Sequence, residues 1–211
     1  MMKKLIYILI ITVSIFSISI LSIDAVAVTS GYEGYAIYRD GVAFGIEWHA
    51  GLMNQPSSTY ENNTIIHTDG HNTKYGTWLD FVGSNGFKGV YKPKAGLSNV
   101  QRGYALTTGR ALASENIPYD VRYQLNYSSD RYGKWVRTYE ITSMRCDGLV
   151  EYAYEWNDIR VYGSIENNLW NISWGDEEIW KHHSYFNITP KSQASNYMTL
   201  ILSSRPMGSY K

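Results

Sequence analysis

The stretch Arg-Cys-Asp-Gly-Leu-Val-Glu-Tyr, residues 145–152, contains the only cysteine of this 211-residue chain. Thr142 and Ser143 lie just upstream and offer side chains that can cap a helix N-terminus. Apolar residues follow at spacings that suit one helix face, namely Leu149, Val150, Ala153 and Tyr154. We therefore expect a helix that begins at about Cys146 and ends at about Trp156.

Cys146 has the position of a nucleophile. In the first turn of a helix, unpaired backbone N–H groups and the helix dipole favour the thiolate, which is the reactive form of cysteine. The alternative is a structural role, because free cysteine is among the most frequently buried residue types. A lone cysteine excludes an internal disulfide.

The N-terminus has the pattern of an export signal. Lysines at positions 3–4 precede an uncharged run at 5–22, and Ala-Val-Ala at 25–27 supplies the small residues of a cleavage site. Cleavage after Ala27 makes residues 1–27 a signal peptide and predicts a secreted or cell-envelope protein. The run is also just long enough to span a bilayer. The alternative is that the signal is not cleaved and the run remains as a membrane anchor. After cleavage we expect no stable membrane span.

Residues 28–211 are long enough for one domain with a real core. The 19 basic and 19 acidic side chains balance, so no global field attracts nucleic acid or an anionic membrane surface. One cysteine provides no disulfide framework, and a free thiol kept in an exported protein favours a reactive role. Strand and helix signals both occur, without repeats or linkers, and predict a single α+β domain.

Strand signals are densest before the cysteine. The runs at 32–39 and 42–48 flank Asp40-Gly41, a hairpin turn signal, and residues 49–53 continue the second run. After a polar segment, residues 64–68 form another short strand candidate. Further short strand or helix candidates lie at 78–82, 89–91, 160–162 and 169–173.

Helix signals lie on both sides of the cysteine. Ala, Leu and Tyr recur at helical spacing over 100–114, before Asn-Ile-Pro at 116–118, which predicts a helix that stops there. A polar loop is expected at 126–134. Thr189-Pro190 has the order of an N-cap followed by proline at the first helical position.

Two histidines are candidates for activating the thiol. A cysteine nucleophile needs a base within hydrogen-bond reach and a third group that orients the base. His49 lies in a strand context and His67 closes the next strand, so antiparallel pairing would set the two imidazoles side by side. The helix that carries Cys146 could then pack on the sheet and bring its sulfur to His49. The alternatives are a half-buried, backbone-bonded His49 and a strand-end surface His67.

Three elements resemble a known family. Cys-Asp-Gly-Leu-Val at 146–150 resembles the cysteine motif of the NlpC-type cell-wall peptidases of the papain-like superfamily, and Ile-Pro-Tyr-Asp at 117–120 resembles their Pro-Tyr element. His-Ala-Gly-Leu at 49–52 with Ile-Ile-His at 65–67 resembles their histidine hairpin. Both histidines precede the cysteine, as in the circularly permuted branch with the YiiX/YebB-like proteins and lecithin–retinol acyltransferase. The resemblance spans about 48–156.

The resemblance implies a permuted papain-like α+β fold in which the cysteine helix packs on an antiparallel sheet. It makes Cys146 the nucleophile, His49 the general base, His67 the polar third member and Tyr119 a pocket residue. The Cys146 backbone N–H would meet the oxyanion. The implied activity is that of a cysteine hydrolase or acyltransferase without a cofactor. It would cleave an amide or ester of a peptide, cell-wall or acyl-lipid substrate through a thioacyl-enzyme.

The charges that flank the cysteine differ from the family pattern. The cell-wall enzymes usually have Asp before the cysteine and Ser after it, where they help to hold a peptide amine, whereas this chain has Arg145 and Asp147. We include both residues among the substrate-binding candidates, since an Arg can meet a carboxylate or phosphate. The alternative for Arg145 is a surface or ion-paired side chain.

Two other classes of function compete with the cysteine hydrolase. His67-x-Asp69-x-His71 offers three ligands that Zn²⁺ accepts, but Gly70 in a turn breaks the alternation that one strand face requires, so we expect no metal site. A non-catalytic secreted binding module would also suit export and the 15% of aromatic residues. Aromatic residues are equally typical of a β-rich core.

Overall fold

The computed structural model describes residues 31–41, 47–55, 63–128, 136–162 and 188–206. Several predicted segments lie outside these residues, namely the signal peptide at 1–27, most of the run at 42–48 and the strand candidate at 169–173. In the part of the chain that is described, no helix is both long and apolar enough to cross a membrane.

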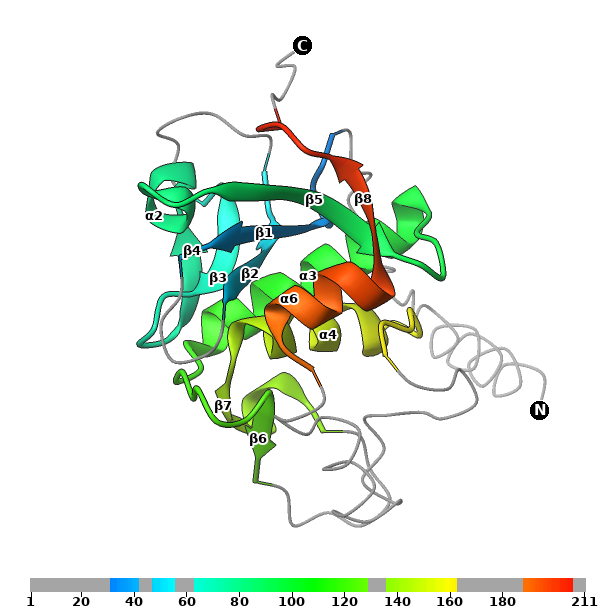
Figure 1. The fold of residues 1–211 in the computed structure, drawn as a ribbon. Helices are drawn as coiled ribbons and strands as arrows, with labels where there is room; N and C mark the ends of the chain where they lie inside the picture. Colours follow the sequence, from blue (N-terminus) through cyan, green and yellow to red (C-terminus); the bar gives the residue numbers. More distant parts are fainter. Residues whose placement is uncertain (1–30, 42–46, 56–62, 129–135, 163–187, 207–211) are drawn as a thin grey trace, which may run out of the picture.

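A six-stranded antiparallel sheet forms the centre of the molecule (Figure 1). Its strand order is β4-β3-β2-β1-β5-β8, and β6 and β7 pair separately as a small antiparallel ribbon. The strands are β1 (Ala36–Asp40), β2 (Trp48–Met53), β3 (Ile65–Thr68), β4 (Thr73–Gly76), β5 (Phe87–Pro93), β6 (Leu125–Tyr127), β7 (Ile141–Met144) and β8 (Met198–Leu202).

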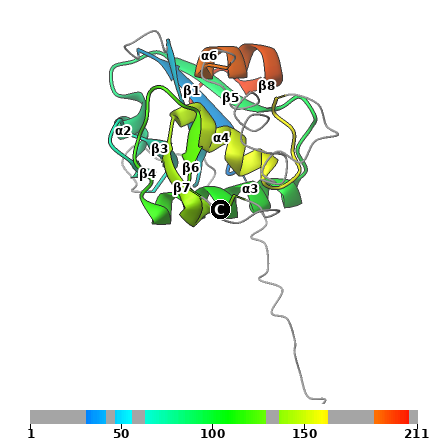
Figure 2. The same ribbon diagram turned by 90° about the horizontal axis from the view of Figure 1, so that it is seen from below.

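Among the described residues, three α-helices of at least five residues accompany the sheet, and α3 and α4 lie side by side beneath it (Figures 1 and 2). Local side chains cap the starts of α3 and α6. Ser98 and Gln101 form a capping box at α3, and Thr189 caps α6 with Pro190 at its first position, as the sequence predicted. The described helical segments are α2 (Trp78–Val82), α3 (Asn99–Glu115), the 3₁₀ turn η1 (Thr138–Glu140), α4 (Cys146–Glu155), α6 (Pro190–Ser192) and the π turn η3 (Gln193–Tyr197).

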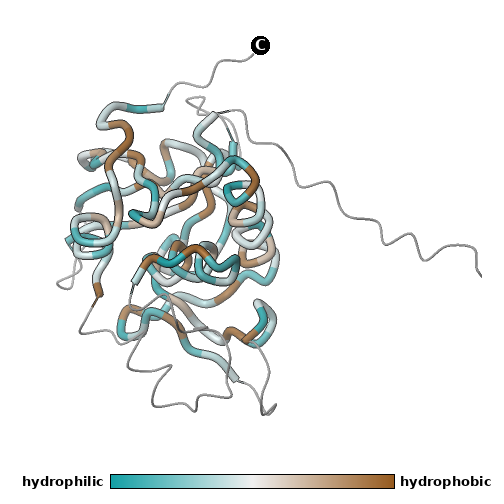
Figure 3. Tube along the Cα trace, turned by 90° about the vertical axis from the view of Figure 1, so that its right-hand side faces the viewer, coloured by the Kyte–Doolittle hydropathy of each residue, from teal (hydrophilic) through white to brown (hydrophobic). Residues whose placement is uncertain are grey.

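Alternation along the strands divides the core into two clusters. Ala50 and Leu52 of β2 pack with α3 and α4, whereas Met53 packs with Phe81 of α2 in the second cluster. Figure 3 shows apolar (brown) and polar (teal) stretches alternating along the described elements. Because successive strand residues point to opposite faces, one sheet supports helices on both sides.

All ten residues of α4 are buried, so this helix is the centre of the larger cluster. It packs against β2 and α3. Gly148 permits a close approach here, since a Cβ on it would lie 1.8 Å from the backbone oxygen of Gln124. The expected α+β class, with the cysteine helix packed on an antiparallel sheet, is therefore confirmed.

Some local predictions were wrong. Thr142 and Ser143 belong to β7 and do not cap α4, whose N-cap residue is Arg145 without a side-chain cap bond, because pairing with β6 takes up that backbone. Asp40 lies opposite Trp48, so the tight turn at Asp40-Gly41 is not formed. Strand β6 extends into the start of the expected polar loop, β4, β7 and β8 were not predicted, and residues 160–162 form no strand.

The close approach at Gly148 predicts that a larger residue at this position destabilises the fold. Gly148→Ala should lower the free energy of unfolding by about 3 kcal/mol, because the added methyl group meets a backbone oxygen that cannot move alone. Gly109→Ala is the matched control, because its Cβ would meet only the ends of two side chains, those of Leu52 and Ile66, and no backbone atom. Urea unfolding measures both changes, and equal stability of the two variants would contradict the packing argument.

Candidate functional site

His49 and His67 lie side by side, as the sequence predicted. Gly51 is paired with His67 across β2 and β3, which sets His49, two residues earlier, diagonally beside the His67 ring. Nε2 of His49 and Nδ1 of His67 are 3.2 Å apart, within hydrogen-bond distance. The two rings meet edge to face and both contact Phe81 of α2.

The hydrogen bond between the rings fixes how His49 could act. For Nδ1 of His49 to serve as a base, Nε2 must carry the proton and donate it to Nδ1 of His67. The proton of His67 then lies on Nε2, a buried atom without a hydrogen-bond partner among the described residues. In this tautomer Nδ1 of His49 is free to act as the base, and Nδ1 of His67 accepts the hydrogen bond from the other nitrogen of the His49 ring.

Both imidazoles are held neutral. Burial lowers the pKa of His67 to about 4 and places that of His49 well below its ordinary value, with His67 and Arg39 acting on His49 in the same direction. Neither ring is therefore an imidazolium at pH 7 in this structure. A neutral His49 is suited to accept a proton.

Cys146 begins α4 but is completely buried. Burial raises the pKa of its thiol to about 12, and the Asp147 carboxylate adds to the effect. The backbone amides of Ala50 and Asp147 act in the opposite sense but do not outweigh burial. The expectation of a thiolate at neutral pH was therefore wrong, because a helix N-terminus in the core does not replace hydration.

The backbone amide of Ala50 lowers the pKa of Cys146 through a hydrogen bond, so the sulfur lies near β2. Ala50 is the residue that follows His49 in this strand. The helix and the strand also share the larger apolar cluster. Among the described residues, however, no hydrogen bond joins Cys146 to either imidazole. The structure thus brings the two histidines together on the Phe81 side of the sheet, whereas the thiol belongs to the larger cluster, which packs on the opposite face of β2.

A cavity of about 660 Å³ opens beside the histidines. It lies where the ends of β1 and β3 and the start of β2 meet the segment that precedes β6. Tyr119 lines it, as the sequence predicted, and Cys146 does not. The lining residues are Arg39, Gly41, His49, His67, Thr68, Asp69, Gly70, Asp80, Tyr119, Asp120, Val121 and Arg122.

Arg145 and Asp147 occupy a different place from the one expected of substrate-binding residues. Their side chains are completely buried and form a two-point ion pair, with Nε–Oδ1 and Nη2–Oδ2 distances of 2.5 and 2.7 Å. Arg145 also donates to the backbone oxygen of Ile188 at 2.6 Å. Neither residue lines the cavity, so the pair links segments of the fold.

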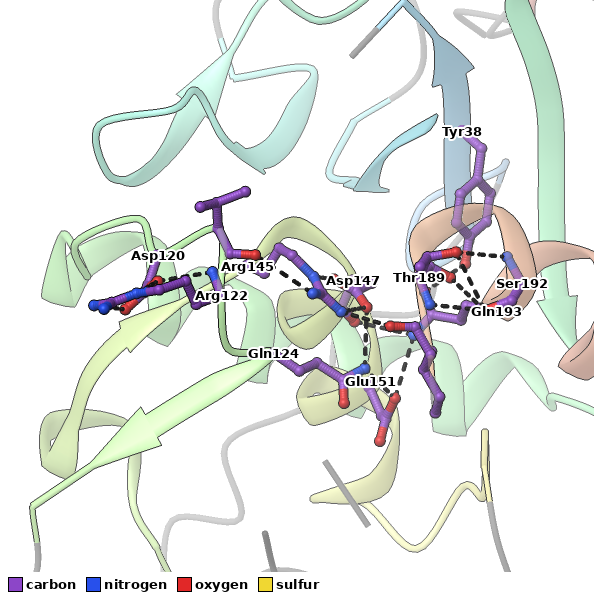
Figure 4. A network of polar contacts seen from close by, with 12 residues as sticks. Tyr38, Asp120, Arg122, Gln124, Arg145, Asp147, Glu151, Thr189, Ser192 and Gln193 are labelled. Atoms are coloured by element: carbon purple, nitrogen blue, oxygen red, sulfur yellow. Dashed lines mark hydrogen bonds and ion pairs between the residues drawn. The ribbon is translucent and has the colours of Figure 1, made fainter. Parts of the chain in front are cut away.

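The ion pair continues into a polar network through the core (Figure 4). The side-chain amide of Gln124 donates to Glu151 at 2.5 Å and lies 3.3 Å from Asp147. Gln193 donates to the backbone oxygen of Asp147 and accepts from the buried hydroxyl of Tyr38 at 2.8 Å. The network thereby connects β1 and the π turn to Asp147 and Glu151, which lie in the first two turns of α4.

Sequence reasoning missed Arg39, Gln124 and Gln193. Arg39 is paired directly with His49 across β1 and β2, so the correct hairpin register would have found it. The two glutamines come from segments far apart along the chain, and no local pattern signals their meeting.

No arrangement of three or more His, Cys, Asp or Glu side chains that could hold a metal ion occurs within the described residues. The Asp69 carboxylate instead pairs with Lys74 at 2.5 Å and accepts backbone N–H groups from His71 and Asn72. The histidine and aspartate at 67 and 69 thus have partners other than a metal.

Comparison with known proteins gives no relative. No protein-family model, curated protein or solved structure matches the chain.

The neutral imidazoles predict a pH-dependent stability. Between pH 6.5 and about 4 the unfolded chain binds a proton at position 67 that the folded protein does not, so the free energy of unfolding should fall as the pH falls through this range. His67 alone accounts for about 3 kcal/mol. Chemical unfolding at several pH values measures it, with His67→Gln expected to flatten the curve. Identical curves would exclude a buried neutral His67.

The buried ion pair predicts non-additive mutations. Arg145→Leu or Asp147→Leu alone should each lower the free energy of unfolding by about 3–5 kcal/mol, because each leaves one buried charge without its partner. The double variant should lose clearly less than the sum of the single losses. Calorimetry or urea unfolding can measure this cycle. Two single variants with wild-type stability would restore the substrate-binding interpretation.

Proposed function

We propose that the protein is an exported cysteine hydrolase or acyltransferase that cleaves an amide or ester bond through a thioacyl-enzyme on Cys146. The observation that carries the proposal is the 3.2 Å contact between His49 and His67 in a cavity beside β2, the strand on which the helix of Cys146 packs. The permuted papain-like fold, the NlpC-type relationship and the signal peptide at 1–27 belong to the same proposal.

The chemistry follows from the neutral groups. His49 accepts the thiol proton on Nδ1 while the sulfur of Cys146 attacks the carbonyl carbon. The tetrahedral intermediate collapses, the C–N or C–O bond breaks, and the leaving group takes the proton from His49. Water or another acceptor then attacks the thioester with His49 again as base, which releases the acyl product and restores the thiol.

His67 has a positioning role in this scheme. As His49 becomes an imidazolium, its Nε2–H donates to the neutral Nδ1 of His67, which holds the ring in place and spreads the charge. Phe81 packs against both rings and limits their rotation. Because the sulfur is buried, the reaction also requires a shift that extends the cavity to Cys146.

One observation favours a second candidate, a non-catalytic secreted binding module. A completely buried thiol with a raised pKa is what a structural cysteine would show. In that case the cavity binds a ligand without chemistry. The two functions differ in whether Cys146 becomes acylated.

Acylation of Cys146 tests the proposal. The wild-type protein without residues 1–27 should hydrolyse 4-nitrophenyl hexanoate and carry the acyl mass on Cys146 after rapid quenching. Cys146→Ser and His49→Ala should each lower turnover by about 1,000-fold or more, and His67→Ala by less, since it acts through His49. His71→Ala is the matched control, because His71 is exposed and does not line the cavity.

The thiol should react with iodoacetamide more slowly than a free cysteine near pH 7, because it is buried and neutral. Fast alkylation at pH 6–7 would show that the thiol is accessible and ionised in solution, which would contradict its burial. Equal ester hydrolysis by the wild type and Cys146→Ser would favour the binding module.

A further inference from the structure

The charged side chains around the cavity have partners, with one exception. Asp69 pairs with Lys74, and Asp80 accepts the backbone N–H of Thr77 at 2.8 Å, where it caps α2. Arg122 lies 3.4 Å from Asp120. The carboxylates of Asp69, Asp80 and Asp120 therefore each have a hydrogen-bond or ion-pair partner. Of the two arginines in the cavity lining, Arg122 has a counter-ion.

Arg39 is the exception. Its Nη1 donates to the backbone oxygen of Asp40 at 2.7 Å, and its Nε is a buried atom without a hydrogen-bond partner among the described residues. No ion pair joins Arg39 to a carboxylate there, because Asp40 pairs with Lys88. A half-buried guanidinium thus lines the cavity without an ion pair to any of the described residues.

Arg39 lies beside the two histidines. It is the partner of His49 across β1 and β2, and its guanidinium lies 5.9 Å from the centre of the Phe81 ring, which also touches both imidazoles. Two more polar atoms of cavity-lining residues have no hydrogen-bond partner among the described residues, Nε2 of His67 and Oγ1 of Thr68. Buried polar groups are normally bonded, so these residues of the cavity lining leave part of their hydrogen-bonding capacity unused.

We propose that Arg39 binds an anionic group of the substrate, a carboxylate or a phosphate carried near the bond that is cleaved. This deepens the proposed function and rests on it. A planar guanidinium offers paired donors that match either anion. Burial lowers the pKa of Arg39, and a bound anion would offset the cost of holding this charge away from water. Arg39 is in this sense a specificity residue beside His49.

Two esters that differ in one charge test the role in turnover. The wild type should hydrolyse mono-4-nitrophenyl adipate with a kcat/KM about 10- to 100-fold above that of 4-nitrophenyl hexanoate, as for a hydrogen bond to a charged group. Arg39→Gln should abolish this preference, mainly through KM, and Arg39→Lys should keep part of it. Arg122→Gln is the matched control, because its cation already has a partner, and should keep the preference.

Binding without turnover provides the second readout. Adipate and inorganic phosphate would each be titrated by calorimetry into Cys146→Ala, with and without Arg39→Gln. Weaker binding of either anion by about tenfold or more in the Arg39 variant supports the proposal, and the tighter anion identifies the chemistry. Unchanged binding of both anions overturns it.

The kinetic outcomes separate the two proposals. A wild type without preference for the charged ester, or an Arg39→Gln that slows both esters equally, overturns the anion site and shows that Arg39 acts on the reacting carbonyl or on folding. If neither ester is hydrolysed beyond the Cys146→Ala background, the hydrolase proposal fails. The calorimetric comparison then still decides whether Arg39 binds an anion.

Discussion

The buried ion pair between Arg145 and Asp147 is the interaction on which the arrangement around α4 depends. It stands at the first turn of a helix whose ten residues are all buried, and it reaches the backbone at Ile188, more than forty residues away in the chain. Burial alone would lower the pKa of Arg145, but the Asp147 carboxylate outweighs it and raises that pKa. Arg145 therefore stays charged, and its buried guanidinium requires the side chain of Asp147 as its partner.

The same helix start sets the chemistry of Cys146. A hydrated helix N-terminus would favour a thiolate, whereas here the neighbouring charges compensate each other and water is excluded. The imidazoles of His49 and His67 are neutral for the same reason. The site therefore holds neutral groups in the core and, at the cavity, the cation of Arg39, which forms no ion pair within the described part of the chain.

How far the sequence predicts this molecule depends on the range of each interaction. The helices at 99–115 and 146–155 and the cap at Thr189 follow from residues within a few positions, and they were predicted closely. Strands β4, β6, β7 and β8 were missed because they are short. The pairing of β6 with β7 and of β8 with β5 also joins separate segments, whereas β4 forms a local hairpin with β3. The register of β1 on β2 was wrong because a local turn signal gave way to long-range packing.

Within the candidate site, the sequence by itself determined which residues are candidates for chemistry, namely the one cysteine at a helix start and the two histidines on successive strands, and the resemblance added Tyr119. Only the tertiary structure decided their states. It placed the His49 and His67 rings 3.2 Å apart, turned Arg145 and Asp147 inward to each other, and exposed Arg39 to the cavity. The physical reason is that residue type and spacing set local conformation. Burial and charge compensation, in contrast, arise only when segments distant in the chain pack together.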